Sequence, residues 1–168
     1  MTINNGHLNN EEYRAIRKVL GLSQQEAQNL HGLKNIRTIQ QWEKGKNTTS
    51  ACACAKILNT LHLANEFIKD KFFNIRHHRS QPAIFLTYKD EEDERYTNIL
   101  LNEFPTLGAY KMAVARAYVE ALERGFDSHI VIFSSKEYES YLVANNLDDT
   151  LSNRDDWARI HYIKFCKA

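Results

Sequence analysis

Side chains that can recognise a nucleic-acid base are concentrated in the stretch NIRTIQQWEKGK, residues 35–46. Within it, Ile36, Ile39 and Trp42 recur every three residues, which predicts a short helix with one apolar face. The other positions of this helix carry hydrogen-bonding side chains, namely Arg37, Thr38, Gln40 and Gln41. Arginine can pair with guanine O6 and N7, glutamine with adenine N6 and N7, and threonine can contact a thymine methyl group. The stretch therefore predicts a helix that is anchored by one face and contacts a partner with the other.

The residues around this helix are of types that hold phosphate groups. Lys44 and Lys46 flank Gly45 at its end, and Lys34 precedes it. We therefore predict that double-stranded DNA is bound by Gln24, Lys34, Asn35, Arg37, Thr38, Gln40, Gln41, Lys44 and Lys46. Trp42 is expected to be buried and structural.

The first half of the chain contains short helices with clear start and stop signals. Asn10 is the predicted N-cap of the first helix, and Gly21 ends it. Ser23, followed by Glu26, predicts a capping box at the start of a second helix, which ends at Gly32. The predicted helices cover residues 10–21, 23–32, 35–45 and about 50–75. Two short helices joined by a tight turn, the second with a polar outer face, are typical of a helix-turn-helix.

The patterns change at RHHRSQP, residues 76–82. Short apolar runs predict strands over 83–88 and 129–135, and the alternation in ARIHYIKF predicts a last strand over 158–165. Apolar residues at helical spacing predict helices over 107–125 and 134–146. The predicted fold class is α+β, with an all-helical domain over 1–79 and a small α+β domain over 80–168.

The charge of the chain is unevenly distributed. Residues 1–80 contain 12 Lys and Arg against 6 Asp and Glu, a balance of +6, whereas residues 81–168 contain 10 against 15, a balance of −5. A basic first half suggests a polyanionic partner for that half. No uncharged apolar run approaches the ~20 residues of a membrane span, and the start lacks a secretory pattern, so we expect a cytoplasmic protein without a membrane partner.

Neither a metal, a cofactor nor a catalytic residue is predicted. Cys52 and Cys54 lie two positions apart on a predicted helix and cannot easily share an ion, so we interpret them as small buried residues. The acidic run from Asp90 to Glu94 lacks the glycine of a calcium loop. The pairs His77 and His78, and Ser134 and Ser135, lie in no known catalytic motif.

The sequence also allows an alternative function, the binding of RNA. Phe72 and Phe73 lie among the cations Lys69, Lys71, Arg76 and Arg79 and the histidines His77 and His78, a combination that can stack on RNA and neutralise it. We favour the interpretation that both phenylalanines belong to the core. An RNA-binding translational regulator or an antitoxin of a toxin–antitoxin pair is therefore the alternative function.

The motifs LGLSQQEA, LHGL and QQWEKGK resemble the lambda-repressor-like (XRE) helix-turn-helix superfamily. Within it, EYRAIRKVLGL, a spacing from Gly32 to Trp42 one residue longer than usual, and the long helix that follows are most similar to the YdiL-like regulators. That group includes the anti-CRISPR-associated (Aca) autorepressors. The resemblance covers residues 8–75, and more loosely extends to about residue 133.

The resemblance implies a homodimeric repressor whose C-terminal domain dimerises and which binds an inverted repeat in the promoter of its own operon. Arg37 falls where the group carries a DNA-reading arginine, with Gln40 and Gln41 in the following recognition positions. Two features depart from the group. Gln28 stands where relatives favour a small residue, with Ala27 one place earlier, and residues 134–168 extend past the compact form.

Overall fold

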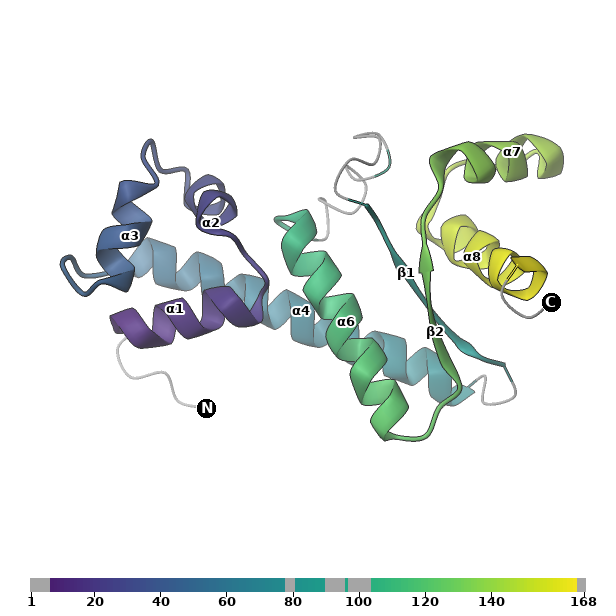
Figure 1. The fold of residues 1–168 in the computed structure, drawn as a ribbon, viewed down its shortest axis with the longest axis horizontal. Coiled ribbons are helices and arrows are strands. Elements are labelled where there is room, and N and C mark those ends of the chain that lie inside the picture. Colours follow the sequence, from purple (N-terminus) through teal and green to yellow (C-terminus); the bar gives the residue numbers. More distant parts are fainter. Residues whose placement is uncertain (1–6, 78–80, 90–95, 97–103, 166–168) are drawn as a thin grey trace. The chain divides into compact units, whose positions relative to one another are not determined.

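A computed structural model describes residues 7–77, 81–89, 96 and 104–165 of the chain (Figure 1). The fold is α+β, and the described residues form seven helices and one pair of parallel strands. The elements are α1 (Asn10–Val19), α2 (Gln24–His31), α3 (Arg37–Glu43), α4 (Ala51–His77), β1 (Ala83–Thr87), α6 (Leu107–Glu123), β2 (Ser128–Ile132), α7 (Ser135–Asn145) and α8 (Leu151–Phe165). The acidic run from Asp90 to Glu94 lies outside the described residues, as do His78 and Arg79.

The chain forms two compact units, one from residues 1–67 and 103–113, the other from residues 68–102 and 114–168. Both α4 and α6 contribute residues to each unit, so neither unit is one continuous stretch of chain. The predicted division into domains at residues 79 and 80 stays a prediction.

Paired side-chain and backbone hydrogen bonds start the first two helices. The capping box predicted for α2 is confirmed. Ser23 Oγ accepts a hydrogen bond from the Glu26 amide at 3.1 Å, and the Glu26 carboxylate accepts one from the Ser23 amide at 2.8 Å. In α1 the N-cap is Asn9, and the prediction of Asn10 is wrong by one position. The reason is Glu12, which lies three residues after Asn9 and completes the same kind of box.

An aromatic cluster forms the centre of the first unit. The rings of Tyr13, His31 and Trp42 lie with centroids 5.6–5.8 Å apart, and the Tyr13 hydroxyl is 2.8 Å from His31 Nε2. Trp42 is 6% exposed, which confirms that it is buried. Burial, with a contribution from the charge of Lys56, lowers the pKa of His31 to about 4. His31 is therefore neutral in the folded protein at neutral pH.

In the second unit, β1 and β2 lie between the C-terminal part of α6 and α8 (Figure 1). Phe85 of β1 faces α6, where its ring contacts Tyr118 with centroids 6.0 Å apart. On the opposite face, Phe133 at the end of β2 packs against Trp157 of α8, with centroids 5.4 Å apart. β1 is therefore covered by helices on both faces, as is usual for parallel strands, whereas Ile130 and Ile132 of β2 remain partly exposed.

The predicted last strand over 158–165 is wrong, because these residues belong to α8. The alternation of apolar residues in ARIHYIKF is coincidental, and burial instead follows a helical spacing through Arg154, Trp157, Ala158 and Tyr162. Arg154 is fully buried and donates to both carboxylate oxygens of Asp149 at 2.7–2.8 Å and to the Tyr88 hydroxyl at 3.1 Å. The hydrogen bonds from Arg154 lower the pKa of Asp149, and the bond to Tyr88 links α8 to the residue that follows β1.

Two predictions about the core of α4 are half right. Cys54 is buried and its sulfur accepts from the Leu8 amide at 3.3 Å, but Cys52 is exposed. Phe72 is 6% exposed, whereas Phe73 is 64% exposed. In both pairs the geometry is the reason, because residues one or two positions apart on a helix point in different directions and cannot both face the core.

We expect the stability of the protein to fall between pH 6.5 and pH 4 through His31. The unfolded side chain takes up a proton near pH 6.5, whereas the folded one does so only near pH 4. The stabilisation is thus fully present above pH 6.5 and is lost as the pH falls. Between pH 7.5 and 5, the parent should lose about 1–2 kcal/mol more unfolding free energy than His31→Gln in urea titrations. Equal losses in the two proteins would contradict this account.

Candidate nucleic-acid interface

The turn between α2 and α3 is closed by both backbone and side chain. Gly32 has a positive φ of 68°, and the amides of Gly32 and Leu33 donate to Asn29 and Gln28 carbonyls at 3.0 Å. The Gln28 side chain then donates from Nε2 to the Leu33 carbonyl at 2.9 Å. Ala27 is fully buried while Gln28 is half-buried, so Ala27 is the inner residue of α2. Gln28 braces the turn, which accounts for its departure from the expected small residue.

Asn35 lies at the start of α3. Its Oδ1 accepts from the Arg37 amide at 2.8 Å, and its backbone carbonyl accepts from the Thr38 amide at 3.2 Å. These bonds satisfy two amides at the beginning of α3 that have no partner within the helix. Asn35, which the sequence suggested as a DNA contact, therefore has a capping role in the free protein.

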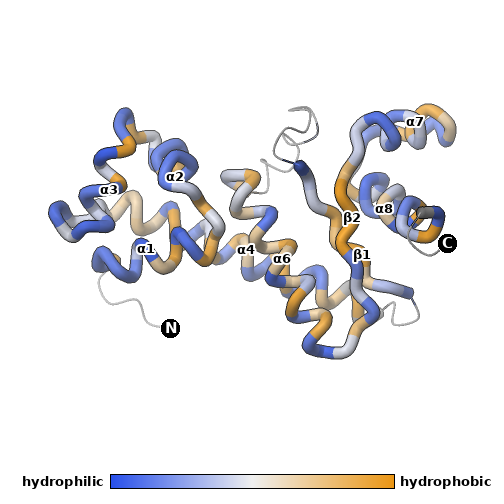
Figure 2. Tube along the Cα trace, viewed as in Figure 1, coloured by the Kyte–Doolittle hydropathy of each residue, from blue (hydrophilic) through white to orange (hydrophobic). Residues whose placement is uncertain are grey.

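Most residues of α3 are hydrophilic, as the colouring of its trace in Figure 2 shows. Among the predicted DNA contacts, the charged residues Lys34, Arg37, Lys44 and Lys46 are exposed, while Thr38, Gln40 and Gln41 are half-buried. Ile39 is fully buried on the opposite side. The structure therefore brings the predicted residues together on α3 and on the segments at its two ends, with Gln24 on α2.

A glycine turn ends α3 and places two lysines at its end. Gly45 has a φ of 65°, its amide donates to the Trp42 carbonyl at 3.0 Å, and the Lys46 amide donates to the Gln41 carbonyl at 2.9 Å. The Gln41 side-chain oxygen also accepts from Asn47 Nδ2 at 2.8 Å. The oxygen of Gln41 is thus engaged, and its amino group has no partner among the described residues.

A polar network that the sequence did not reveal joins α1, α2 and α3. Arg17 of α1 forms an ion pair with Glu43 of α3 and also donates to the Leu22 carbonyl. Gln24 of α2 donates to the other Glu43 oxygen at 2.8 Å and lies at hydrogen-bond distance, 3.5 Å, from the Gln40 side chain. Gln24 therefore links the ion pair to one of the predicted base-reading residues.

This network keeps Glu43 charged although it is largely covered. The side chains of Arg17 and Glu43 are only 10% and 8% exposed. Burial opposes ionisation, but the hydrogen bonds from Arg17 and Gln24 and the charge of Arg17 together lower the pKa of Glu43. A carboxylate neutralised inside the unit adds little repulsion toward a phosphate backbone.

One signal in the sequence could have identified Arg17. Tyr13, Arg17 and Leu20 follow a helical spacing, and all three are buried. A charged residue within a buried stripe requires a partner of opposite charge, because an unpaired buried charge is very costly. Glu43, an acidic residue directly after buried Trp42, is then a candidate partner.

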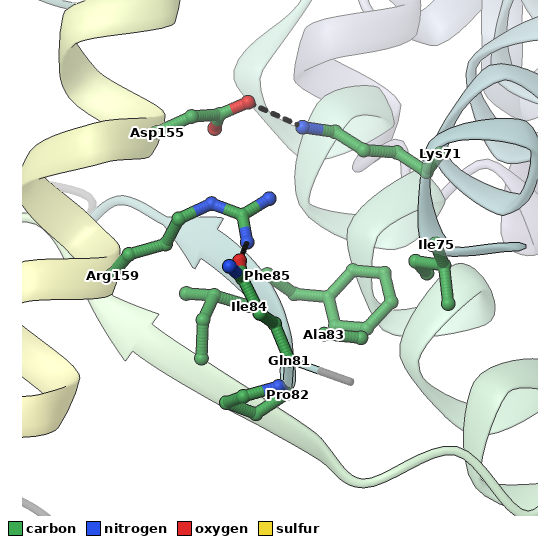
Figure 3. A pocket seen from close by; sticks show the side chains of 9 residues that line it. All are labelled: Lys71, Ile75, Gln81, Pro82, Ala83, Ile84, Phe85, Asp155 and Arg159. Atoms are coloured by element: carbon green, nitrogen blue, oxygen red, sulfur yellow. Dashed lines mark hydrogen bonds and ion pairs between the residues drawn. The ribbon is translucent and has the colours of Figure 1, made fainter. Parts of the chain in front are cut away.

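The second unit contains a cavity of about 140 Å³, shown in Figure 3. Lys71 of α4 and Asp155 of α8 form an ion pair of 3.0 Å at its wall, and Arg159 donates to Gln81 at 3.2 Å. The remaining lining is apolar and comprises Ile75, Pro82, Ala83, Ile84 and Phe85. The lining includes no Ser, Cys or His, so the cavity offers none of the usual nucleophile and base pairs.

Neither a metal site nor a membrane-spanning helix is present among the described residues. No group of three His, Cys, Asp or Glu residues in this part of the chain is arranged to hold a metal ion. None of the described helices is both long enough and apolar enough to cross a membrane.

The chain matches the model of a known protein family. The model of a family described as Aca2/YdiL-like matches residues 8–126, which include α1–α4, β1 and α6 and exclude β2, α7 and α8. The comparison with curated proteins gives no match. The family match indicates a regulatory role and covers the whole helix-turn-helix.

We expect Arg17 and Glu43 to be strongly coupled in a double-mutant cycle. Arg17→Met or Glu43→Leu alone leaves one buried charge without its partner and should cost about 3–5 kcal/mol of stability. The double variant should cost clearly less than the sum, which urea titrations of all four proteins will measure. If a single variant does not fold, recovery of a cooperative transition in the double variant shows the same coupling. Additive losses would contradict it.

Proposed function

The chain belongs to the Aca2/YdiL-like family, and we propose that it is a transcriptional repressor that binds double-stranded DNA through α3. It acts as a homodimer on an inverted repeat in the promoter of its own operon, in the manner of an anti-CRISPR-associated autoregulator. The observation that carries this proposal is the outer face of α3, where exposed Arg37 and half-buried Gln40 and Gln41 are held by a helix anchored through Ile39 and Trp42.

Each predicted contact has a role in this proposal. Arg37, in the first turn of α3, pairs with guanine, and Gln40 and Gln41 contact adenine or neighbouring bases. Thr38 contacts a thymine methyl group or a phosphate. Lys34, Lys44 and Lys46, at the two ends of α3, hold phosphates on either side of the groove. Gln24 and Asn35 orient the reading residues and are close enough to the ends of α3 to contribute phosphate contacts.

An apolar surface on the second unit supports dimerisation. Ile130 and Ile132 of β2 are 43% and 52% exposed, and Val119 and Leu122 of α6 are 51% and 46% exposed. Because Ile130 is paired in register with Phe85, which faces α6, both isoleucines lie on the α6 side of the sheet. Figure 2 shows the hydrophobic colour running along β2. We call these four residues the apolar patch.

A second copy of the chain is the occupant that fits this patch. No described strand pairs with the outer edge of β2, and an exposed apolar edge strand readily pairs with another strand. Two copies related by a two-fold axis can join their β2 edges and cover both patches at once. Binding to an inverted repeat requires that the two α3 helices of a dimer reach half-sites about one turn of DNA, ~34 Å, apart.

RNA binding has one observation in its favour. Phe73 is 64% exposed on α4 and Lys69, one helical turn earlier, is exposed too, so an aromatic ring and a cation are both accessible. The side chains of Arg76 and His77 lie outside the described residues. Competition between selected DNA and single-stranded RNA, repeated with Phe73→Ala, would reveal this second activity. An antitoxin role has no separate structural support.

Arg37→Ala should weaken binding to a selected operator by about 1–3 kcal/mol and remove the preference at one base pair in each half-site. Arg37→Lys is the matched control, because it keeps the charge but cannot form the two parallel hydrogen bonds. We expect the lysine variant to retain the salt dependence of the parent and to lose the guanine preference. Gel shifts over a range of salt and over mutated operators measure both effects. Parent-like discrimination by folded Arg37→Ala would remove Arg37 from the interface.

Ile132→Lys should convert the protein to a monomer in sedimentation experiments, because it places a charge on the most exposed apolar side chain of β2, at the proposed dimer edge. The matched control is Ile160→Lys, because the parent residue is similarly exposed, at 49%, but belongs to α8, which lies on the other side of the sheet. Circular dichroism checks that both variants fold. A dimeric Ile132→Lys protein, or a monomeric control, would show that the patch is not the dimer surface.

A further inference from the structure

One carboxylate caps two helices in the first unit. Glu26 Oε2 accepts from the Ser23 amide at 2.8 Å and completes the capping box of α2. Glu26 Oε1 accepts from the amide of Gly108 at 3.2 Å, in the first turn of α6. Amides in a first turn have no partner inside their own helix, and the helix dipole favours a negative charge there. Glu26 is therefore bound to α2 and to α6 through the same side chain.

Glycines permit this close approach. A β-carbon at position 108 would lie 2.5 Å from Glu26 Oε1, which is too close without movement of the carboxylate. On the other side, a β-carbon at position 21 would lie 3.3 Å from the Gly108 carbonyl and 3.2 Å from the Met112 β-carbon. The start of α6 therefore packs directly against the corner between α1 and α2.

A second anchor fixes the same segment. The ring of Phe67 on α4 lies 5.4 Å from that of Phe104 and 5.7 Å from that of Tyr110, in edge-to-face contacts. The beginning of α6 thus belongs to the unit that carries α3, although it lies far along the chain from the helix-turn-helix. The same helix continues to Glu123 and carries Val119 and Leu122 of the apolar patch.

We propose that Glu26 is a positioning residue for binding to an inverted repeat, acting through Gly108. By capping both helices it fixes α2, the neighbour of the recognition helix, to the helix that leads to the proposed dimer surface. This inference rests on the proposed function. Glu26 itself does not contact DNA in this proposal. Loss of the bond to Gly108 leaves each helix-turn-helix able to read a half-site but loosens its connection to the dimer, so that simultaneous binding of two half-sites becomes weaker.

The chain contains a matched control for this residue. Glu12 completes the capping box of α1 with Asn9, through bonds of 2.8 and 2.9 Å that correspond to those of Glu26. The structure gives Glu12 no bond to a second helix among the described residues. Glu12→Ala therefore removes a cap alone, whereas Glu26→Ala removes a cap and the bond to α6.

The test compares the full-length parent, Glu12→Ala and Glu26→Ala on a selected inverted repeat and on one half-site of it. Glu26→Ala should bind the repeat at least about 10-fold more weakly than the parent, with half-site binding lowered about 3-fold or less. Glu12→Ala should bind both within about 3-fold of the parent. Equal behaviour of the two variants, or equal losses on repeat and half-site, would overturn the proposal.

Hydrogen exchange without DNA separates this inference from the proposed function. The Gly108 amide should exchange at least about 10-fold faster in Glu26→Ala than in the parent, and at an unchanged rate in Glu12→Ala. Unchanged exchange in Glu26→Ala would overturn the inference whatever DNA binding shows. If the parent protein binds no DNA sequence preferentially, the proposed function fails, and the role of Glu26 in binding an inverted repeat fails with it. Faster exchange of the Gly108 amide in Glu26→Ala would still establish the bond between α2 and α6. Gly108→Ala provides a second variant in which the Ser23 and Glu26 side chains are retained.

Discussion

The ion pair between Arg17 and Glu43 is the constraint on which the candidate interface depends. Two largely covered charges are costly to remove from water, and they are tolerated only where hydrogen bonds complete their surroundings. Here those bonds come from Gln24 and from the Leu22 carbonyl, so that residues of all three helices must be in place together. The orientation of α3, and with it the direction of its polar face, follows from this requirement and from the burial of Trp42.

Local signals in the sequence were sufficient for much of the first unit. The Ser23 and Glu26 box, the glycine turns at Gly32 and Gly45 and the apolar stripe of α3 each depend on neighbours in the chain, and the structure has them as predicted. The ion pair of Arg17 and Glu43 could not be derived in this way, because it joins residues 26 positions apart. The bond between Glu26 and Gly108 spans 82 positions and has no local signature at all.

The second unit was harder to predict because tertiary packing outweighs local pattern there. The alternation that suggested a strand over 158–165 is weaker than the requirement to cover the sheet, which α8 meets through Trp157, Ala158 and Tyr162. Residues 134–168, whose role the sequence left open, form two helices beyond the family match, and α8 supplies buried Arg154 to the core. The extension thus completes one face of the sheet, while the apolar patch remains exposed on the other side.

The central claim is that α3 reads DNA sequence and that two copies do so together. Selection of random double-stranded DNA by the purified full-length protein, followed by sequencing of the bound fragments, tests it most directly. The account predicts an enriched inverted repeat whose half-site centres lie about 10 base pairs apart and whose half-sites each contain an invariant guanine. Enrichment of no motif, or of a single unrepeated site bound by a monomer, would contradict it.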